Sequence, residues 1–126
     1  MSTKQILVID NECYIQEIIQ IALETISGWQ VFTAGSGREG LAMAEQSQPD
    51  AILLDVMMPD MDGLTTFAKL QENNKTQAIP VILLTAKVQA ADQQRYRDLG
   101  VKATLSKPFD PLQLPTQISD VLGWAT

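Results

Sequence analysis

Residues 51–54, Ala-Ile-Leu-Leu, form a short apolar run without polar alternation, and the carboxylate of Asp55 ends it. This pattern is typical of a strand that is buried on both faces inside a parallel sheet. A loop containing Pro59, Asp62 and Gly63 follows. Open α/β sheets bind their ligands outside the carboxyl ends of central strands, which is where Asp55 is expected. From this run alone, the simpler alternative that Asp55 only ends the strand or caps the next element stays open.

Four further segments favour strands of the same sheet. Residues 6–9 and 81–84 are apolar runs like the first, whereas segments 29–34 and 103–105 are shorter or more polar. Helical patterns and capping signals lie between the five segments. This alternation predicts an α/β fold with right-handed crossovers, a doubly wound five-stranded parallel sheet and five helices. With 126 residues and no repeat or linker, the chain is expected to be one domain over residues 1–126.

Several helix ends carry specific signals. Gly28 is expected as a left-handed C-cap of the first helix, and residues 36–39, Ser-Gly-Arg-Glu, as a capping box of the second. Asp62 or a neighbour is expected to start the third helix, and residues 88–99 are expected to form the fourth.

The last helix is harder to place from the sequence. Asp110 and Pro111 have the residue types of an N-cap and a first helical position. Pro115 lacks a backbone N–H, which is harmless only in the first turn of a helix. The sequence therefore predicts either a later start, near Gln113, or a kink.

The composition excludes several functions. The formal net charge of −6 argues against nucleic acid as a direct partner, because phosphate binding needs a basic face. Without histidine, the chain can form neither a Ser-His-Asp nor a Cys-His catalytic group, nor an imidazole-ligated zinc site. The single cysteine, Cys13, cannot form an internal disulfide and is expected to pack against other residues. The N-terminal residues are neither a signal peptide nor a membrane span, so we expect a cytoplasmic protein without a membrane partner.

Polar side chains follow the predicted strands. These residues are Asp10, Asn11, Glu12, Asp55, Thr85 and Lys107. Because the carboxyl ends of parallel strands meet at one edge of a sheet, these groups are expected to converge. Two carboxylates with carbonyl oxygens suit Mg²⁺. A hydroxyl and an ammonium opposite the metal would hold the oxygens of a transferring phosphoryl group, with Asp55 as the nucleophile.

Four motifs resemble the receiver domain of bacterial two-component response regulators, in particular its single-domain, CheY-like members. They are Ile-Leu-Val-Ile before Asp10, Met-Met-Pro-Asp-Met-Asp-Gly after Asp55, Leu-Leu-Thr-Ala around Thr85, and Lys-Pro-Phe from Lys107. The resemblance covers essentially the whole chain. It implies the flavodoxin-like strand order 2-1-3-4-5. It also implies Mg²⁺-dependent transfer of a phosphoryl group to Asp55 from the phosphohistidine of a partner, either a sensor histidine kinase or a phosphotransfer protein.

The resemblance further implies a set of metal ligands. Asp10 and Asn11 match the acidic pair that binds Mg²⁺, Asp55 adds a carboxylate, and the backbone carbonyl of Met57 adds an oxygen. Asn11 departs from the family, which usually has a second aspartate there, so Mg²⁺ is expected to bind more weakly. Glu12 is expected to be a solvated acid at the start of the first helix, with partial substitution for the missing aspartate as the alternative.

The remaining implied roles concern the phosphoryl group and the response. Thr85 would bind a phosphoryl oxygen and shift inward on phosphorylation, and Lys107 would pair with the phosphoryl group. The Lys107–Pro108 peptide bond is expected to be cis. The family meets targets or dimerises through the face formed by the fourth helix, the fifth strand and the fifth helix. On that face, Thr104 stands where the family usually has an aromatic residue, so the switch is expected to be different or weaker.

Three other functions fit parts of this pattern. A phosphatase of the haloacid-dehalogenase type needs a second carboxylate two residues after the nucleophile, where this chain has Met57. A flavin-binding domain would need a phosphate-binding loop after the first strand, and Asp10 and Glu12 would repel a phosphate. The third alternative is a pseudo-receiver that docks to a partner without being phosphorylated, and the residues at Asn11 and Thr104 keep it open.

Overall fold

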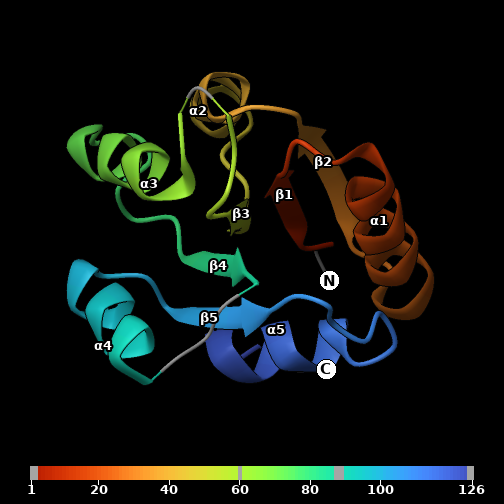
Figure 1. The fold of residues 1–126 in the computed structure, drawn as a ribbon. Helices are drawn as coiled ribbons and strands as arrows, with labels where there is room; N and C mark the ends of the chain where they lie inside the picture. Colours follow the sequence, from red (N-terminus) through yellow and green to blue (C-terminus); the bar gives the residue numbers. More distant parts are fainter. Residues whose placement is uncertain (1–2, 60, 87–89, 125–126) are drawn as a thin grey trace.

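The computed structural model describes residues 3–59, 61–86 and 90–124, so the expected helix start at residue 88 lies outside the described residues. Within these ranges the strands are β1 (Gln5–Ile9), β2 (Gln30–Ala34), β3 (Ala51–Asp55), β4 (Val81–Thr85) and β5 (Ala103–Ser106). The helices are α1 (Cys13–Ser27), α2 (Gly37–Ser47), α3 (Gly63–Glu72), α4 (Ala90–Leu99) and α5 (Leu114–Leu122). The strands form one parallel sheet in the order β2-β1-β3-β4-β5, which confirms the predicted fold (Figure 1).

The sheet separates two hydrophobic layers. Helices α2, α3 and α4 cover one face, and α1 and α5 cover the other (Figure 1). Successive side chains of a strand point to opposite faces, and β3 shows why its run has no polar alternation. Ile52 and Leu54 pack in the first layer, whereas Ala51 and Leu53 pack in the second. A central strand with helices on both faces needs apolar residues at every position, and this leaves its end as the place for a functional group.

Most of the predicted helix ends are confirmed. Gly28 has φ 69° and caps α1, the Ser36 hydroxyl accepts a hydrogen bond from the Glu39 N–H at 3.2 Å, and Asp62 caps α3. The N–H of Thr65 donates to Asp62 Oδ1 at 2.8 Å, and this hydrogen bond lowers the pKa of Asp62. Among the helices that the structure describes, none is long and apolar enough to span a membrane.

The predicted late start of the last helix is also confirmed, but its cap is not the one expected. Helix α5 has Gln113 as its N-cap, and Pro115 lies in the first turn. Asp110 and Pro111 instead belong to the preceding turn, in which the Leu112 N–H donates to Asp110 Oδ1 at 3.0 Å.

The packing role expected for Cys13 is wrong. Its side chain is exposed at the first position of α1. A single cysteine adds no periodic pattern to the sequence. The apolar side chains that α1 packs against the sheet belong to other residues. The buried residues of α1 are Ile19, Ala22 and Leu23.

Gly63 allows α3 to begin directly against the end of β3. Its N–H donates to the carbonyl of Val56 at 2.9 Å. A Cβ added at Gly63 would lie 2.3 Å from the backbone oxygen of Asp55 and 2.8 Å from the Cα of Val56. Both of these atoms are backbone atoms, so relief of the clash requires the loop after β3 to move.

Replacement Gly63→Ala is therefore expected to lower the free energy of unfolding by about 2 kcal/mol, as overpacking against fixed atoms typically does. Urea denaturation measures this change. Gly35→Ala is the matched control, because its Cβ would meet only Gln16 Nε2 at 3.9 Å, an ordinary contact. Equal stability of the two variants would show that the loop after β3 accommodates the added methyl group without strain.

Candidate functional site

The carboxyl ends of β1, β3, β4 and β5 meet at one edge of the sheet. Asp10 directly follows β1, Asp55 ends β3, Thr85 ends β4 and Lys107 directly follows β5. The backbone N–H of Lys107 donates to the carbonyl of Thr85 at 2.8 Å, which fixes the start of the loop after β5 against the end of β4. The structure thus brings together four groups that are far apart in the sequence, as the parallel topology predicts.

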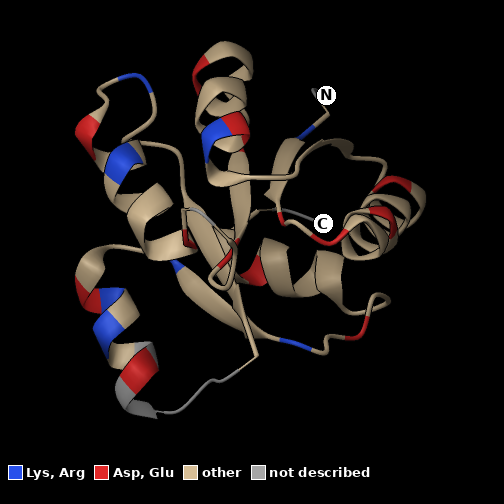
Figure 2. Ribbon diagram, turned by 45° about the horizontal axis from the view of Figure 1, so that its top comes forward, with Lys and Arg blue, Asp and Glu red and all other residues tan. Residues whose placement is uncertain are grey.

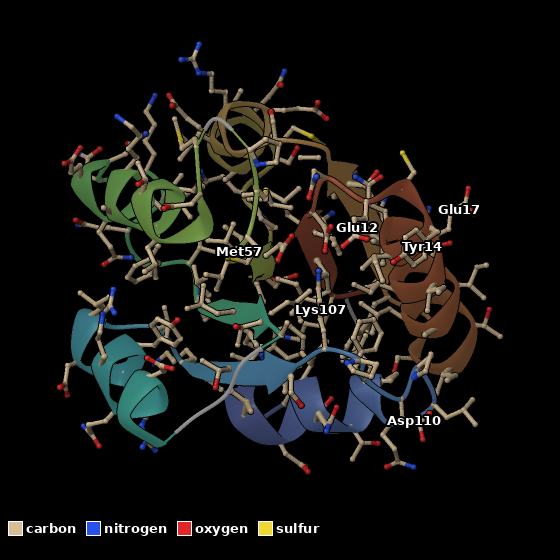
Figure 3. The ribbon with its side chains drawn as sticks, in the orientation of Figure 1. Glu12, Tyr14, Glu17, Met57, Lys107 and Asp110 are labelled. Carbon is tan, nitrogen blue, oxygen red and sulfur yellow. The ribbon has the colours of Figure 1, made fainter. Side chains whose placement is uncertain are left out.

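The ammonium of Lys107 is the centre of this site. Its Nζ lies 2.8 Å from Asp10 Oδ2, 3.3 Å from Asp55 Oδ1 and 3.6 Å from Glu12 Oε1. Asp10 is 0% exposed and Asp55 is 3% exposed. Buried carboxylates need a compensating charge, because transfer of an unpaired ion out of water costs several kcal/mol. Lys107 supplies that charge, and Figure 3 shows it reaching from the loop after β5 toward the start of α1.

Burial and charge shift the protonation of the two central groups. Burial first, and then the negative charge of Asp10, raise the pKa of Asp55, while Lys107 and the Met57 N–H act in the opposite direction. Burial lowers the pKa of Lys107, but its hydrogen bond with Asp10 and the charges of Asp10 and Asp55 outweigh this and raise it. The site therefore pairs an ammonium that stays protonated with a carboxylate whose ionised form is destabilised by burial.

Three carboxylates are close enough to share a cation. One oxygen from each of Asp10, Glu12 and Asp55 lies within 4.8 Å of the other two. Carboxylate oxygens are the ligands that Mg²⁺ takes in proteins, together with carbonyl oxygens and waters. The donor set of this edge therefore fits a hard divalent cation.

The other predicted residues lie around this centre. Thr85 is 4% exposed, and Asn11 is exposed beside Asp10. The N–H of Met57 donates to Asp55 Oδ1 at 3.2 Å, and its side chain is 74% exposed. The expected cis Lys107–Pro108 peptide bond is confirmed. The ligand roles of Asn11 and of the Met57 carbonyl stay predictions.

Two further residues lie beside the site. Glu12 was predicted to be a solvated acid, with partial substitution for the missing aspartate as the alternative, and it pairs with Lys107 and faces the two buried aspartates. Tyr14 was not considered, and its hydroxyl interacts with Glu12, which raises the pKa of Tyr14 through a hydrogen bond and through charge. The sequence carried no separate signal for Tyr14, which is the second residue of α1.

Charged residues of both signs lie on the same helices. Figure 2 shows lysine and arginine interspersed with acidic residues on α2, α3 and α4.

Comparison with known proteins agrees with the resemblance seen in the sequence motifs. The model of the response regulator receiver domain matches residues 6–119. The transcriptional regulator RpaA of Synechocystis is 38% identical over 118 residues, which are 94% of this chain and 48% of that protein. PhoP of Bacillus subtilis, which regulates alkaline phosphatase synthesis, is 37% identical over 94% of this chain and 47% of its own length. The chain thus spans about half the length of these curated relatives.

Solved structures match over nearly their entire length. The chemotaxis protein CheY4 of Vibrio cholerae has a TM-score of 0.88 and 28% identity, covering 95% of this chain and 99% of that one. The receiver domain of the sensor histidine kinase PA1611 from Pseudomonas aeruginosa has a TM-score of 0.84 and 25% identity, covering 97% and 99%, and is described with a magnesium ion in its active-site cleft. Because the family model, the strand order and the residues at the sheet edge all agree, this chain belongs to the response regulator receiver domain family of two-component signalling.

Proposed function

We propose that residues 1–126 act as one receiver domain in which Asp55 accepts a phosphoryl group in the presence of Mg²⁺. The observation that carries the proposal is the position of Lys107, whose Nζ lies between the buried carboxylates of Asp10 and Asp55. An ammonium at that place neutralises charge that would otherwise accumulate when an anionic group reaches Asp55. The magnesium ion described in the PA1611 receiver domain supports the same metal here.

In the proposed reaction, a carboxylate oxygen of Asp55 attacks the phosphorus of a phosphohistidine. The phosphorus–nitrogen bond breaks, and its electron pair stays on the imidazole of the donor, a sensor histidine kinase or a phosphotransfer protein. Lys107 pairs with one phosphoryl oxygen, and the Thr85 hydroxyl donates to another. Bound Mg²⁺ would neutralise part of the charge on these oxygens. Its predicted ligands are Asp10, Asp55, the Met57 carbonyl and one of the two neighbours Asn11 and Glu12.

The response is proposed to pass through the face of α4, β5 and α5 to a target protein or to a second copy of the chain. Arg97, Lys102 and Thr104 border a small depression on this face. Thr104 pairs with Leu83 on β4, two positions before Thr85, so a shift at the phosphorylated edge has a short backbone route to this surface. We place this signalling in the cytoplasm, where sensor kinases present their phosphohistidine.

A phosphatase is the weaker candidate. Hydrolysis through an aspartyl phosphate needs a group that moves a proton two residues after the nucleophile, and the thioether of Met57 cannot do so. The phosphoryl group is therefore expected to persist on Asp55. Persistence suits a signal and does not suit turnover.

The proposed function is tested by mass spectrometry of the intact protein after incubation with Mg²⁺ and a small phosphodonor such as acetyl phosphate. The wild-type protein is expected to gain the mass of one phosphate, and Asp55→Ala is expected to gain none. Asp120→Ala, which removes an exposed carboxylate on α5, is the matched control and is expected to behave like the wild type. A wild-type protein that gains no phosphate would favour the pseudo-receiver alternative, and a gain in Asp55→Ala would place the acceptor elsewhere.

A further inference from the structure

We propose that Glu12, rather than Asn11, supplies the carboxylate that the family usually takes from the residue after Asp10, and that Tyr14 positions it. This inference rests on the proposed function, because it assigns a ligand within the same site. It differs from the pattern implied by the family, in which the residue directly after Asp10 holds the metal.

The backbone at the start of α1 turns the Glu12 side chain toward the site. Glu12 is the N-cap residue of α1, with φ −97° and ψ 111°, and its carbonyl accepts from the N–H groups of Ile15 and Gln16 at 3.1 Å each. Its N–H donates to Asp10 Oδ1 at 2.9 Å, which ties the two residues together. Within the described part of the chain, the Glu12 carboxylate caps no backbone N–H of α1, so it is available for another role.

The position of the carboxylate favours that role. One Glu12 oxygen lies within 4.8 Å of carboxylate oxygens of both Asp10 and Asp55, and Glu12 Oε1 lies 3.6 Å from Lys107 Nζ. Asn11 lies between Asp10 and Glu12 in the sequence, and its side chain is exposed. Asn11 lies at a bend between Asp10 and Glu12, and both of these neighbours contact the Lys107 ammonium.

Charge gives a second reason. With Glu12 as a ligand, the cation meets the carboxylates of Asp10, Glu12 and Asp55, the same number that two aspartates and the acceptor would provide. With Asn11 instead, it would meet one negative charge fewer. Because the attraction between a divalent cation and a carboxylate is large at contact distance, the site with Glu12 binds Mg²⁺ more tightly.

Tyr14 holds Glu12 in this position. Its hydroxyl hydrogen-bonds with the Glu12 carboxylate, and Figure 3 shows the two side chains beside one another above the loop that carries Lys107. Tyr14 is 59% exposed, so its ring adds little to the core. A hydroxyl that already orients a metal-binding carboxylate reduces the conformational freedom that this side chain loses when the metal binds. Groups behind metal ligands raise the affinity for the metal in this way.

Isothermal titration calorimetry with MgCl₂ tests the inference, since the dissociation constant for Mg²⁺ is measured without phosphorylation. Glu12→Gln is expected to weaken binding by about tenfold, and Tyr14→Phe by up to about tenfold, the low end for a group behind a metal ligand. Asn11→Ala is expected to change the dissociation constant by less than about twofold, as for an exposed residue that does not touch the ion. Glu17→Gln is the matched control, because Glu17 is an exposed glutamate of the same helix that lies away from Lys107 (Figure 3).

Urea denaturation without Mg²⁺ separates ligation from folding, since Glu12→Gln and Tyr14→Phe are expected to leave the unfolding midpoint unchanged. Wild-type affinity in Glu12→Gln, or a larger loss in Asn11→Ala than in Glu12→Gln, would overturn the assignment of Glu12 while leaving the proposed function intact. Wild-type affinity in Tyr14→Phe would remove the positioning role. If the wild-type protein itself bound no Mg²⁺, the metal-dependent proposed function would fail together with this inference.

Discussion

Replacement Lys107→Met is expected to lower the free energy of unfolding at neutral pH by about 3 kcal/mol in a buffer without divalent cations, in the range for loss of one partner of a buried ion pair. Methionine keeps most of the aliphatic stem, so the loss reports the charge and not a cavity. Two nearly inaccessible carboxylates, Asp10 and Asp55, would be left without the ammonium that lies 2.8 Å and 3.3 Å from them. Urea denaturation measures the difference.

The pH dependence of this stability difference shows whether the lost charge is its cause. Lys107 lowers the pKa of Asp55, which burial and Asp10 raise, so removal of Lys107 raises that pKa further. A carboxyl group with a raised pKa in the folded state destabilises the fold fully above that pKa. The cost decreases as the pH falls below it and disappears below the unfolded value. The stability gap between Lys107→Met and the wild type is therefore expected to be largest at neutral pH and to shrink as the solution is acidified. In the wild type, the contribution of Lys107 is present below its ordinary pKa and is lost at strongly alkaline pH, as the pH rises through its raised value.

Lys102→Met is the matched control, because Lys102 is exposed and a surface charge contributes at most about 1 kcal/mol. Added Mg²⁺ is expected to stabilise Lys107→Met more than the wild type, since the ion would replace part of the missing positive charge. A gap of the same size at every pH would show that Lys107 stabilises the fold by packing and not by pairing with the acids.

The sequence was sufficient for the fold because the strands carry unambiguous patterns. Residues 51–54 and 81–84 are apolar throughout, and such short runs are typical of strands covered on both faces. The end of each run marks the sheet edge, so the meeting of Asp10, Asp55 and Lys107 followed from parallel topology without coordinates. Thr85 was placed by the same reasoning.

The details that could not be predicted depend on side-chain direction and on local turns. By residue type and position, Glu12 looks like an ordinary acid at the start of a helix. Only its contacts with Lys107 and Tyr14 show that it faces the site. At the last helix, Asp110 and Pro111 carry the usual starting signals, yet the chain first makes a turn and Gln113 becomes the N-cap. In both cases the local preference is weak, and tertiary contacts override it.

The lifetime of the phosphorylated state is expected to depend on Met57. The Met57 N–H is bonded to Asp55 Oδ1, so its side chain emerges next to the acceptor, on the solvent side (Figure 3). An apolar group there hinders the approach of a water molecule to the phosphorus, whereas an amide can hold one by hydrogen bonds. Met57→Asn is therefore expected to speed the loss of the acyl phosphate by about tenfold, a small share of what a positioned proton-transfer group provides.

The measurement is the decay of the phosphorylated mass after removal of the phosphodonor, with Mg²⁺ held constant. Met57→Leu is the matched control and is expected to keep the wild-type lifetime, because it preserves the apolar character and the approximate size of the side chain while replacing the thioether by a branched hydrocarbon. Since the side chain is 74% exposed, neither replacement is expected to change the unfolding midpoint, so a change in lifetime reports access of water. Equal lifetimes for all three proteins would mean that water reaches the phosphorus by a path that Met57 does not border, and the persistence of the signal would then have to depend on Lys107 and Thr85.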